Sequence, residues 1–223
     1  MKAGAAHKCI VLGGGGHARV LIDCLQRAGT AEILAVLDDD SNLWKKDLLG
    51  VPIIGNDSCL PDLIRQGADT FVVGVGSVGD PSVRIKLFET GLAHRLEPLT
   101  VVHPAAVVSP WAVIGPGCQV MACGVINPCA RLGRQVIVNT GAIVEHDCEL
   151  GDFVHISPGA RLGGTVKIEA GAHIGLGATV IQGLAVGERA VVGAGAVVVK
   201  NVGPRMVVAG VPAQPIKSKQ ATA

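Results

Sequence analysis

The sequence predicts a small α/β, Rossmann-like domain over residues 1–100, followed by a left-handed parallel β-helix over residues 101–223 that ends in a short tail. Three observations predict this order. An aliphatic residue recurs every six positions through the second part, a column of small residues accompanies it, and a glycine-rich loop joins the first apolar run to an amphipathic stretch.

The six-residue repeat determines the second domain. An aliphatic residue occupies every sixth position from Val102 to Val198, and small or β-branched residues occupy nearly every position four residues further on, from Ala106 to Ala196. This period suits neither an α-helix nor an alternating strand. It suits short strands joined by sharp corners, with three hexads to a triangular coil and with coils that stack to bury one continuous core. Glycine and asparagine supply the positive φ that such corners need.

The first domain has a different pattern. Short β-rich runs predict strands at 8–12, 32–37 and 70–75, and amphipathic or proline-led segments predict helices at 19–28, 61–66 and 81–89. The order is βαβαβ, so we expect a small parallel sheet of about three strands.

A glycine loop and an acidic run mark a candidate nucleotide site. The loop from Gly13 to Ala18 fits the pattern G-x-G-x-x-A, and Asp38, Asp39 and Asp40 follow at the end of the second predicted strand. Backbone N–H groups at a helix N-terminus can bind a phosphate or pyrophosphate. The alternative is a glycine turn that only packs the strand on the helix.

Composition excludes several classes of partner. The formal net charge is +1 and aromatic residues make up 2% of the chain, so we expect no nucleic-acid binding. Seven cysteines without a C-x-x-C pair indicate free thiols in a reducing compartment. The first apolar run, from Cys9 to Leu12, is too short for a signal-peptide core, and no stretch is long enough to span a membrane. We therefore expect a soluble, cytoplasmic protein without membrane contact.

The segment around His146 carries the candidate chemistry. His146 occupies the third position of its hexad, beside a corner, so its side chain should point outward, and Asp147 follows it directly. Neutral histidine beside a carboxylate is the usual arrangement of a general base. One coil later Gly164 should stack beside His146, where a bare backbone N–H could bind an oxygen that gains negative charge. The alternative is a solvated surface histidine.

Two further histidines lie elsewhere on the repeat. His155 takes the last position of its hexad and should reach the same cleft from another corner or from a neighbouring subunit. His173 lies one coil beyond His155, and we expect it to form a stacked ladder with His155 on the surface.

The motifs GGGGHA, EHD and FVHISPGARLGG together resemble those of the hexapeptide-repeat nucleotide-sugar N-acetyltransferases of bacterial glycan synthesis, of the bacillosamine and perosamine kinds. Sialic acid O-acetyltransferases of the same build are related. The resemblance covers nearly the whole chain. It implies acetyl-CoA as co-substrate, no metal, and a homotrimer with active sites between subunits.

The resemblance also assigns residues. It implies His146 as the general base and Asp147 as the residue that orients it. The expected acetyl-CoA-binding residues are His155, Gly164, Ala209 and Pro212. The expected substrate-binding residues are Gly13, Gly15, Gly16, His17, Asp38 and Asp39, with Asn139 and Thr140 near a neighbour's substrate.

The implied reaction acetylates the amino group of a nucleotide-linked 4-amino-4,6-dideoxysugar for a surface glycan such as the lipopolysaccharide O-antigen. GDP-perosamine is the first expectation and a UDP-linked bacillosamine precursor the next. Alternatives are a sugar O-acetyltransferase, a non-catalytic β-helix scaffold, an NAD-dependent oxidoreductase and a carbonic-anhydrase-like zinc enzyme. The spacing of His146, His155 and His173 does not obviously build one tetrahedral zinc site.

Overall fold

The computed structural model describes residues 7–216, which divide into two compact units. One unit contains residues 7–76 and 81–104, and the other contains residues 77–80 and 105–216. Residues 77–80 therefore belong with the second unit although they lie within the sequence of the first.

The first unit is an α/β domain around one sheet with the strand order β3-β4-β2-β1-β5-β6. Its strands pair in parallel except β3, which runs antiparallel to β4 at the edge. The strands of this sheet are β1 (His7–Leu12), β2 (Ala31–Leu37), β3 (Asp47–Leu48), β4 (Val51–Gly55), β5 (Thr70–Val73) and β6 (Glu97–Pro98). The short strand β7 (Val101–Val102) lies outside it. The helices are α1 (Gly16–Ala28), α2 (Leu60–Arg65) and α3 (Ser82–Ala93), with 3₁₀ turns η1 (Ser41–Leu43) and η2 (Asp57–Cys59).

Strand β1 and helix α1 form the buried centre of this unit. From Cys9 to Leu12, β1 is fully buried, as a central parallel strand should be. Helix α1 buries one face and ends at Gly29, whose φ of 62° lets its N–H reach the carbonyl of Leu25. The buried face of α1 comprises Ala18, Leu21, Ile22, Cys24 and Leu25.

The sheet is larger than the three strands expected. Strand β4 was not predicted, because Pro52 and Gly55 interrupt its apolar alternation. Pro52 is exposed and pairs with Asp47 of the short edge strand, where a missing N–H is tolerated. The third predicted strand ends at Val73 instead of residue 75, and the last predicted helix continues to Ala93.

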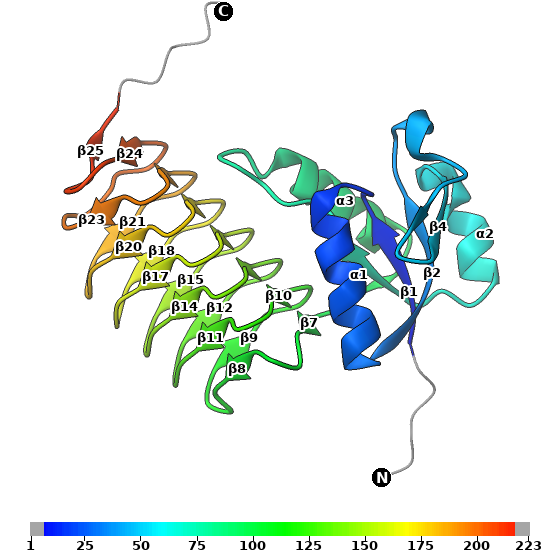
Figure 1. Cartoon of the computed structure of the whole chain (residues 1–223), viewed down its shortest axis with the longest axis horizontal. Coiled ribbons are helices and arrows are strands. Elements are labelled where there is room, and N and C mark those ends of the chain that lie inside the picture. The colour runs from blue at the N-terminus through cyan, green and yellow to red at the C-terminus, as the bar shows by residue number, and fades with distance from the viewer. Residues whose placement is uncertain (1–6, 217–223) are drawn as a thin grey trace, which may run out of the picture. The chain divides into compact units, whose positions relative to one another are not determined.

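The second unit is a left-handed parallel β-helix, which confirms the predicted fold (Figure 1). Residues one coil apart pair in parallel, as Ile137 does with His155 and His155 with His173. One face contains β10 (Gln119–Val120), β13 (Ile137–Val138), β16 (His155–Ile156), β19 (His173–Ile174), β22 (Val191–Val192), β24 (Val207–Ala209) and β25 (Gln214–Pro215). The second contains β8 (Val107–Val108), β11 (Val125–Ile126), β14 (Ile143–Val144), β17 (Arg161–Leu162), β20 (Thr179–Val180) and β23 (Val197–Val198). The third contains β9 (Val113–Ile114), β12 (Arg131–Leu132), β15 (Glu149–Leu150), β18 (Lys167–Ile168) and β21 (Ala185–Val186).

The two predicted columns fill the interior of the β-helix. From Cys118 to Val198 both columns are buried, apart from half-buried Leu184. The aliphatic column is not buried from its start, since Val102 is 37% exposed and Val108 is only partly buried. Val108 lies in β8, the terminal strand of its sheet, so a neighbouring strand covers it on one side only.

No helix within residues 7–216 combines the length and the apolar character that a bilayer crossing requires.

Burial raises the pKa of the Cys9 thiol to about 12 and that of Cys148 to about 11, whereas Cys123 and Cys129 are exposed. All the cysteines are free thiols.

Candidate active site

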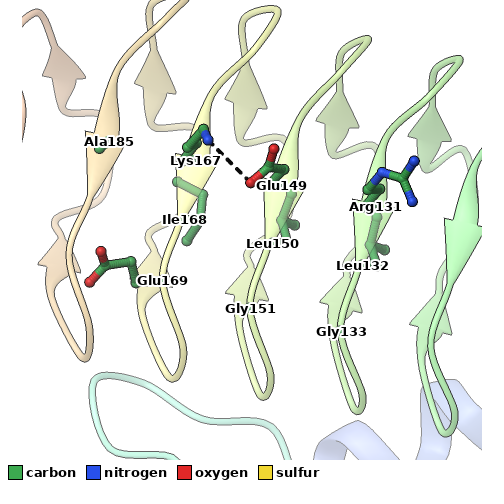
Figure 2. A pocket seen from close by; sticks show the side chains of 10 residues that line it. All are labelled: Arg131, Leu132, Gly133, Glu149, Leu150, Gly151, Lys167, Ile168, Glu169 and Ala185. Carbon is green, nitrogen blue, oxygen red and sulfur yellow. Dashed lines mark ion pairs between the residues drawn. The ribbon is translucent and has the colours of Figure 1, made fainter.

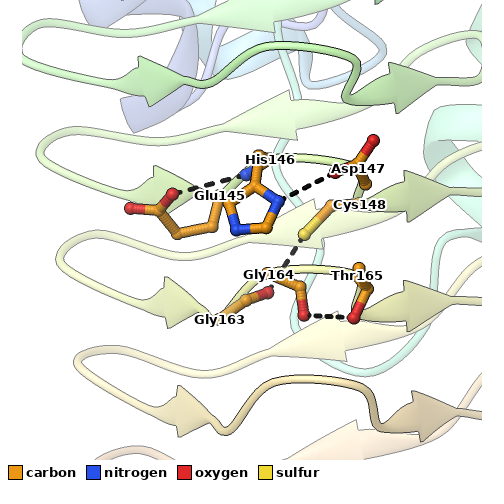
Figure 3. Close-up of polar contacts among 7 residues, drawn as sticks. All are labelled: Glu145, His146, Asp147, Cys148, Gly163, Gly164 and Thr165. Carbon is orange, nitrogen blue, oxygen red and sulfur yellow. Dashed lines mark hydrogen bonds and ion pairs between the residues drawn. The ribbon is translucent and has the colours of Figure 1, made fainter.

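His146 and Asp147 lie at the corner between β14 and β15 (Figure 3). Both side chains point outward and are more than half exposed. Asp147 has a φ of 58°, a left-handed conformation that aspartate tolerates better than most residues. Its N–H donates to the carbonyl of Pro128 in the preceding coil at 3.1 Å, which fixes the corner.

The imidazole of His146 is oriented by its neighbour. Nδ1 of His146 lies 2.8 Å from Oδ2 of Asp147. Because an ionised carboxylate only accepts hydrogen bonds, the ring proton must sit on Nδ1. In this tautomer Nε2 keeps its lone pair and can accept a proton from a substrate.

Gly164 leaves the space that the ring occupies. A β-carbon on Gly164 would lie 2.6 Å from Nε2 of His146, closer than a side chain can approach. The Thr165 N–H donates to the carbonyl of His146 at 2.9 Å, which fixes the register between the coil of His146 and the coil of Gly164. No acceptor within residues 7–216 takes the N–H of Gly164, so this donor stays available beside the imidazole. The predicted stacking of Gly164 on His146 is therefore observed.

His155 lies on a different face from the His146 corner, in β16, and its ring is buried. Nδ1 donates to the carbonyl of Ser77 at 2.7 Å, and Nε2 accepts from Nδ2 of Asn139 at 3.2 Å. Oδ1 of Asn139 in turn accepts from the Thr140 N–H at 2.8 Å. Within one chain, therefore, the structure brings His155 together with Asn139 and not with His146.

The expectation for His173 was wrong in one respect. Its ring stacks on that of His155, with ring centroids 5.3 Å apart, but both rings are buried and form no surface ladder. Nε2 of His173 contacts Oγ of Ser157 at 2.7 Å. Residues 77–80 cover part of this face, which the six-residue pattern alone could not reveal, because the covering segment lies outside the repeat.

The glycine loop of the first unit is held by Asp38. The Gly13 N–H donates to the carbonyl of Leu37 at 2.7 Å, and the Gly14 N–H donates to Oδ2 of Asp38 at 2.6 Å. Oδ1 of Asp38 accepts from the Asp40 N–H at 2.8 Å. Both oxygens of the Asp38 carboxylate therefore accept hydrogen bonds from the backbone, one of them from the glycine loop. Gly15 caps α1, and Gly16 and half-buried His17 begin the helix.

A cavity of about 230 Å³ opens beside this loop. Asp39 and Asp57 lie along it with Lys86, whose Nζ is 3.8 Å from Oδ2 of Asp39. Burial, and secondarily the charge of Asp39, raise the pKa of Asp57 above its ordinary value. Sequence analysis predicted Asp39 but neither Asp57 nor Lys86, since Asp57 follows the unpredicted strand β4.

Another groove lies on the face that contains β12, β15, β18 and β21 (Figure 2). It measures about 580 Å³ and carries charges of both signs, with Nζ of Lys167 lying 3.3 Å from Oε2 of Glu149. None of the predicted site residues lines it.

The C-terminal coils hold the remaining predicted residues. Ala209 ends β24, and exposed Pro212 lies in the turn before β25. Lys200 is exposed and lies at the corner after β23, three coils beyond His146 on the same edge. Sequence analysis did not identify this residue. Residues 7–216 contain no cluster of three histidine, cysteine, aspartate or glutamate side chains suited to a metal ion.

Comparison with known proteins finds similarity to nucleotide-sugar N-acetyltransferases. The model of the PglD N-terminal domain matches residues 8–90. A curated GDP-perosamine N-acetyltransferase of Escherichia coli is 37% identical over 108 residues, and a UDP-N-acetylbacillosamine N-acetyltransferase of Bacillus subtilis is 36% identical over 115 residues. These alignments cover 48% and 50% of this chain and 49% and 50% of the relatives, so the chain spans about half the length of the curated relatives it matches.

Two solved structures match over nearly their whole length. PerB of Caulobacter crescentus, in complex with CoA and GDP-perosamine, is 38% identical with a TM-score of 0.88, over 96% of this chain and 99% of that one. The acetyltransferase domain of PglB of Neisseria gonorrhoeae, in complex with acetyl coenzyme A, is 39% identical with a TM-score of 0.86, over 95% and 100%.

Proposed function

This chain belongs to the hexapeptide-repeat nucleotide-sugar N-acetyltransferases, and we propose that it transfers the acetyl group of acetyl-CoA to the amino group of a nucleotide-linked 4-amino-4,6-dideoxysugar. GDP-perosamine is our first candidate, and a UDP-linked bacillosamine precursor is the second. The ligands of the similar structures, CoA with GDP-perosamine in one and acetyl coenzyme A in the other, support both halves of the reaction.

One observation carries the proposal. At a single corner of the β-helix, an outward imidazole is oriented by a carboxylate at 2.8 Å and lies against a residue without a side chain. The corner thus combines a proton acceptor, Nε2 of His146, with a nearby donor, the N–H of Gly164. Acyl transfer needs both groups.

The chemistry follows from these two groups. The amine nitrogen attacks the thioester carbon and forms the C–N bond, while the carbonyl oxygen gains negative charge and accepts from the Gly164 N–H. Nε2 of His146 takes the proton that the amine loses, and Asp147 stabilises the imidazolium. When the tetrahedral intermediate collapses, the C–S bond breaks, and the thiolate of CoA leaves and is reprotonated by the imidazolium.

We place acetyl-CoA along the same edge of the β-helix, from Gly164 toward the C-terminal coils. Coils are about 4.8 Å apart, so Lys200 lies about 14 Å from His146, a distance comparable to an extended pantetheine arm. Its ammonium would meet the pyrophosphate. Ala209 and Pro212 would border the adenosine end.

His155 would line the site near the acetyl group rather than exchange protons. Both of its ring nitrogens already have hydrogen-bond partners, and its ring is buried. We further propose a homotrimer in the cytoplasm, in which Asn139 and Thr140 contact the substrate of a neighbouring subunit. The product would serve a bacterial surface glycan such as the O-antigen.

The test is release of free thiol from acetyl-CoA, measured with a panel of GDP- and UDP-linked 4-amino-4,6-dideoxysugars. We expect turnover with at least one of them, and an amide in the product by mass spectrometry. An ester would indicate the O-acetyltransferase alternative. Acetyl-CoA binding without turnover on any sugar would favour a scaffold instead.

A further inference from the structure

Trp111 lies on the same edge of the β-helix as His146. It falls between β8 and β9, in the first coil (Figure 1). Strand β9 pairs in parallel with β12, and β12 pairs with β15, so positions 111, 129 and 147 follow one another in three successive coils. Trp111 is therefore two coils away from Asp147, on the side opposite to Gly164.

The indole of Trp111 is open to solvent. Its residue is 75% exposed, and only its backbone N–H is engaged, by Oγ of Ser109 at 3.2 Å. Within residues 7–216 no hydrogen bond or aromatic contact involves the indole. The other tryptophan of the chain, Trp44, is half-buried, and its Nε1 donates to the carbonyl of Asp38 at 2.8 Å. Because tryptophan is usually buried or in contact with a partner, the exposed indole indicates a ligand contact.

The coil between Trp111 and His146 carries only small side chains at this edge. Pro128 and Cys129 occupy it, and both are exposed. Two coils span about 10 Å, and the half-thicknesses of two rings take up about 4 Å of this, so about 6 Å remains. The edge thus has room for one pyranose ring between the indole and the imidazole.

The proposed reaction determines which ligand would lie over this coil. We place acetyl-CoA along the coils that follow Gly164, and its thioester carbon lies beside the N–H of that residue. The attacking amine must then approach Nε2 of His146 from the opposite direction, over Cys129. A hexose that carries this amine extends toward Trp111.

We propose that the indole of Trp111 packs against the hexose ring of the nucleotide-linked substrate and holds its amine at His146, an inference that rests on the proposed function. A 4-amino-4,6-dideoxyhexose has a methyl group on the carbon next to the one that bears the amine, and C–H groups on the faces of its ring. These apolar parts suit the face of an indole, while the ring hydroxyls can stay in water. Trp111 acts as a sugar-binding residue and exchanges no proton.

The binding test is acrylamide quenching of tryptophan fluorescence in the absence of acetyl-CoA. Trp111→Phe leaves Trp44 as the only tryptophan, so the difference between the full chain and this variant reports on Trp111. The ligands are GDP- and UDP-linked 4-amino-4,6-dideoxysugars, with GDP and UDP as the controls that lack the sugar. We expect at least one sugar to lower the quenching of Trp111 by about 2-fold or more, and GDP and UDP to leave it unchanged.

Kinetics give a second readout. Trp111→Ala should raise the KM for the amino sugar about 10-fold and leave kcat and the KM for acetyl-CoA close to the wild type, because the contact is made equally in the ground state and the transition state. Trp111→Phe should recover most of the loss, since it keeps an aromatic face. The matched control is Val113→Ala, a change of another exposed apolar residue in the same coil, which should leave both KM values unchanged.

Several results would overturn the proposal. They are an indole already shielded in the free protein, no binding of any sugar of the panel, unchanged quenching of Trp111 with a saturating sugar, or equal shielding by GDP or UDP alone. An unchanged KM for the amino sugar in Trp111→Ala, or an equal rise in the KM for acetyl-CoA, would also contradict it.

The two readouts separate this inference from the proposed function. If a sugar shields Trp111 but no thiol is released from acetyl-CoA, the proposed acetyl transfer fails and the sugar contact stands. If sugars are acetylated while Trp111 remains fully accessible to acrylamide, only the sugar contact fails.

Discussion

A β-carbon added to Gly164 would lie 2.6 Å from Nε2 of His146, so the position of the imidazole depends on the absence of a side chain one coil away. The ring cannot keep this position if residue 164 is anything larger than glycine. The corner therefore links the proton acceptor and the backbone donor of the proposed reaction through one steric relationship.

Gly164→Ala should lower kcat by about 10- to 1,000-fold, because the imidazole must move away from the N–H at 164. The fold should survive, since the ring is an exposed side chain that can rotate away. The matched comparison is Gly163→Ala, whose β-carbon would lie 2.7 Å from the backbone nitrogen of Gln182. That variant should lose thermal stability instead. Near-normal kcat in folded Gly164→Ala would contradict the arrangement.

Asp147→Asn should reduce kcat/KM by about 10-fold, less than the loss of the imidazole itself. Asparagine also tolerates the positive φ at this corner, so the variant removes the charge while keeping the backbone. Kinetics over a pH series would check it, together with Asp147→Ala as the variant that loses both. A loss for Asp147→Asn as large as that for His146→Ala would indicate a structural fault.

Lys200→Ala should raise the KM for acetyl-CoA by about 5- to 10-fold and leave the KM for the amino sugar unchanged. The cause would be the loss of one charge-assisted contact to the pyrophosphate. Lys167→Ala is the control, because Lys167 pairs with Glu149 on another face. An unchanged KM for acetyl-CoA would remove Lys200 from the site.

Alkylation should separate the cysteines by burial. Burial raises the pKa of Cys9 to about 12 and that of Cys24 and Cys148 to about 11, so these thiols should stay unmodified by iodoacetamide at pH 8. Exposed Cys123 and Cys129 should react, as peptide mass spectrometry would show.

Of the two reactive thiols, only Cys129 should affect turnover. It shares the corner of Asp147, whose N–H donates to the neighbouring Pro128. Alkylation should therefore inhibit the wild type and the Cys123→Ser variant, and should spare Cys129→Ser. Inhibition that persists in Cys129→Ser would show that another thiol is responsible.

Asp57→Asn should raise the melting temperature at pH 7, since burial and the charge of Asp39 disfavour the ionised Asp57 carboxyl. A raised pKa in the folded state means that protonated Asp57 stabilises the fold at low pH, and that this stabilisation is lost as the pH rises through the raised pKa. The advantage of the variant should therefore disappear in acid, where the wild-type carboxyl is also neutral. Melting curves at pH 7 and below pH 4 would test this.

The six-residue pattern was sufficient to predict the β-helix, because each interior position repeats an identical environment. It also placed His146 beside Gly164, since stacking follows directly from the repeat. The burial of His155 and His173 could not be predicted, because residues 77–80 lie outside the repeat and their contact with this face is a tertiary feature.

The first domain was harder to predict. Its glycine loop follows a known pattern, but the capture of Asp38 by the Gly14 N–H depends on side-chain geometry. Strand β4 could not be recognised from the sequence, because Pro52 and Gly55 interrupt its apolar pattern. Asp57, which follows this strand and lines the cavity, was therefore not predicted. Lys86 lay in a predicted helix, and only the packing of α3 shows that it borders the cavity.

The most direct test of the central claim is the rate of thiol release from acetyl-CoA by His146→Ala, measured with a nucleotide-linked amino sugar that the wild type acetylates. The account predicts a folded variant that binds both substrates and turns over about 10²- to 10⁴-fold more slowly. A variant that keeps nearly the wild-type kcat would contradict it.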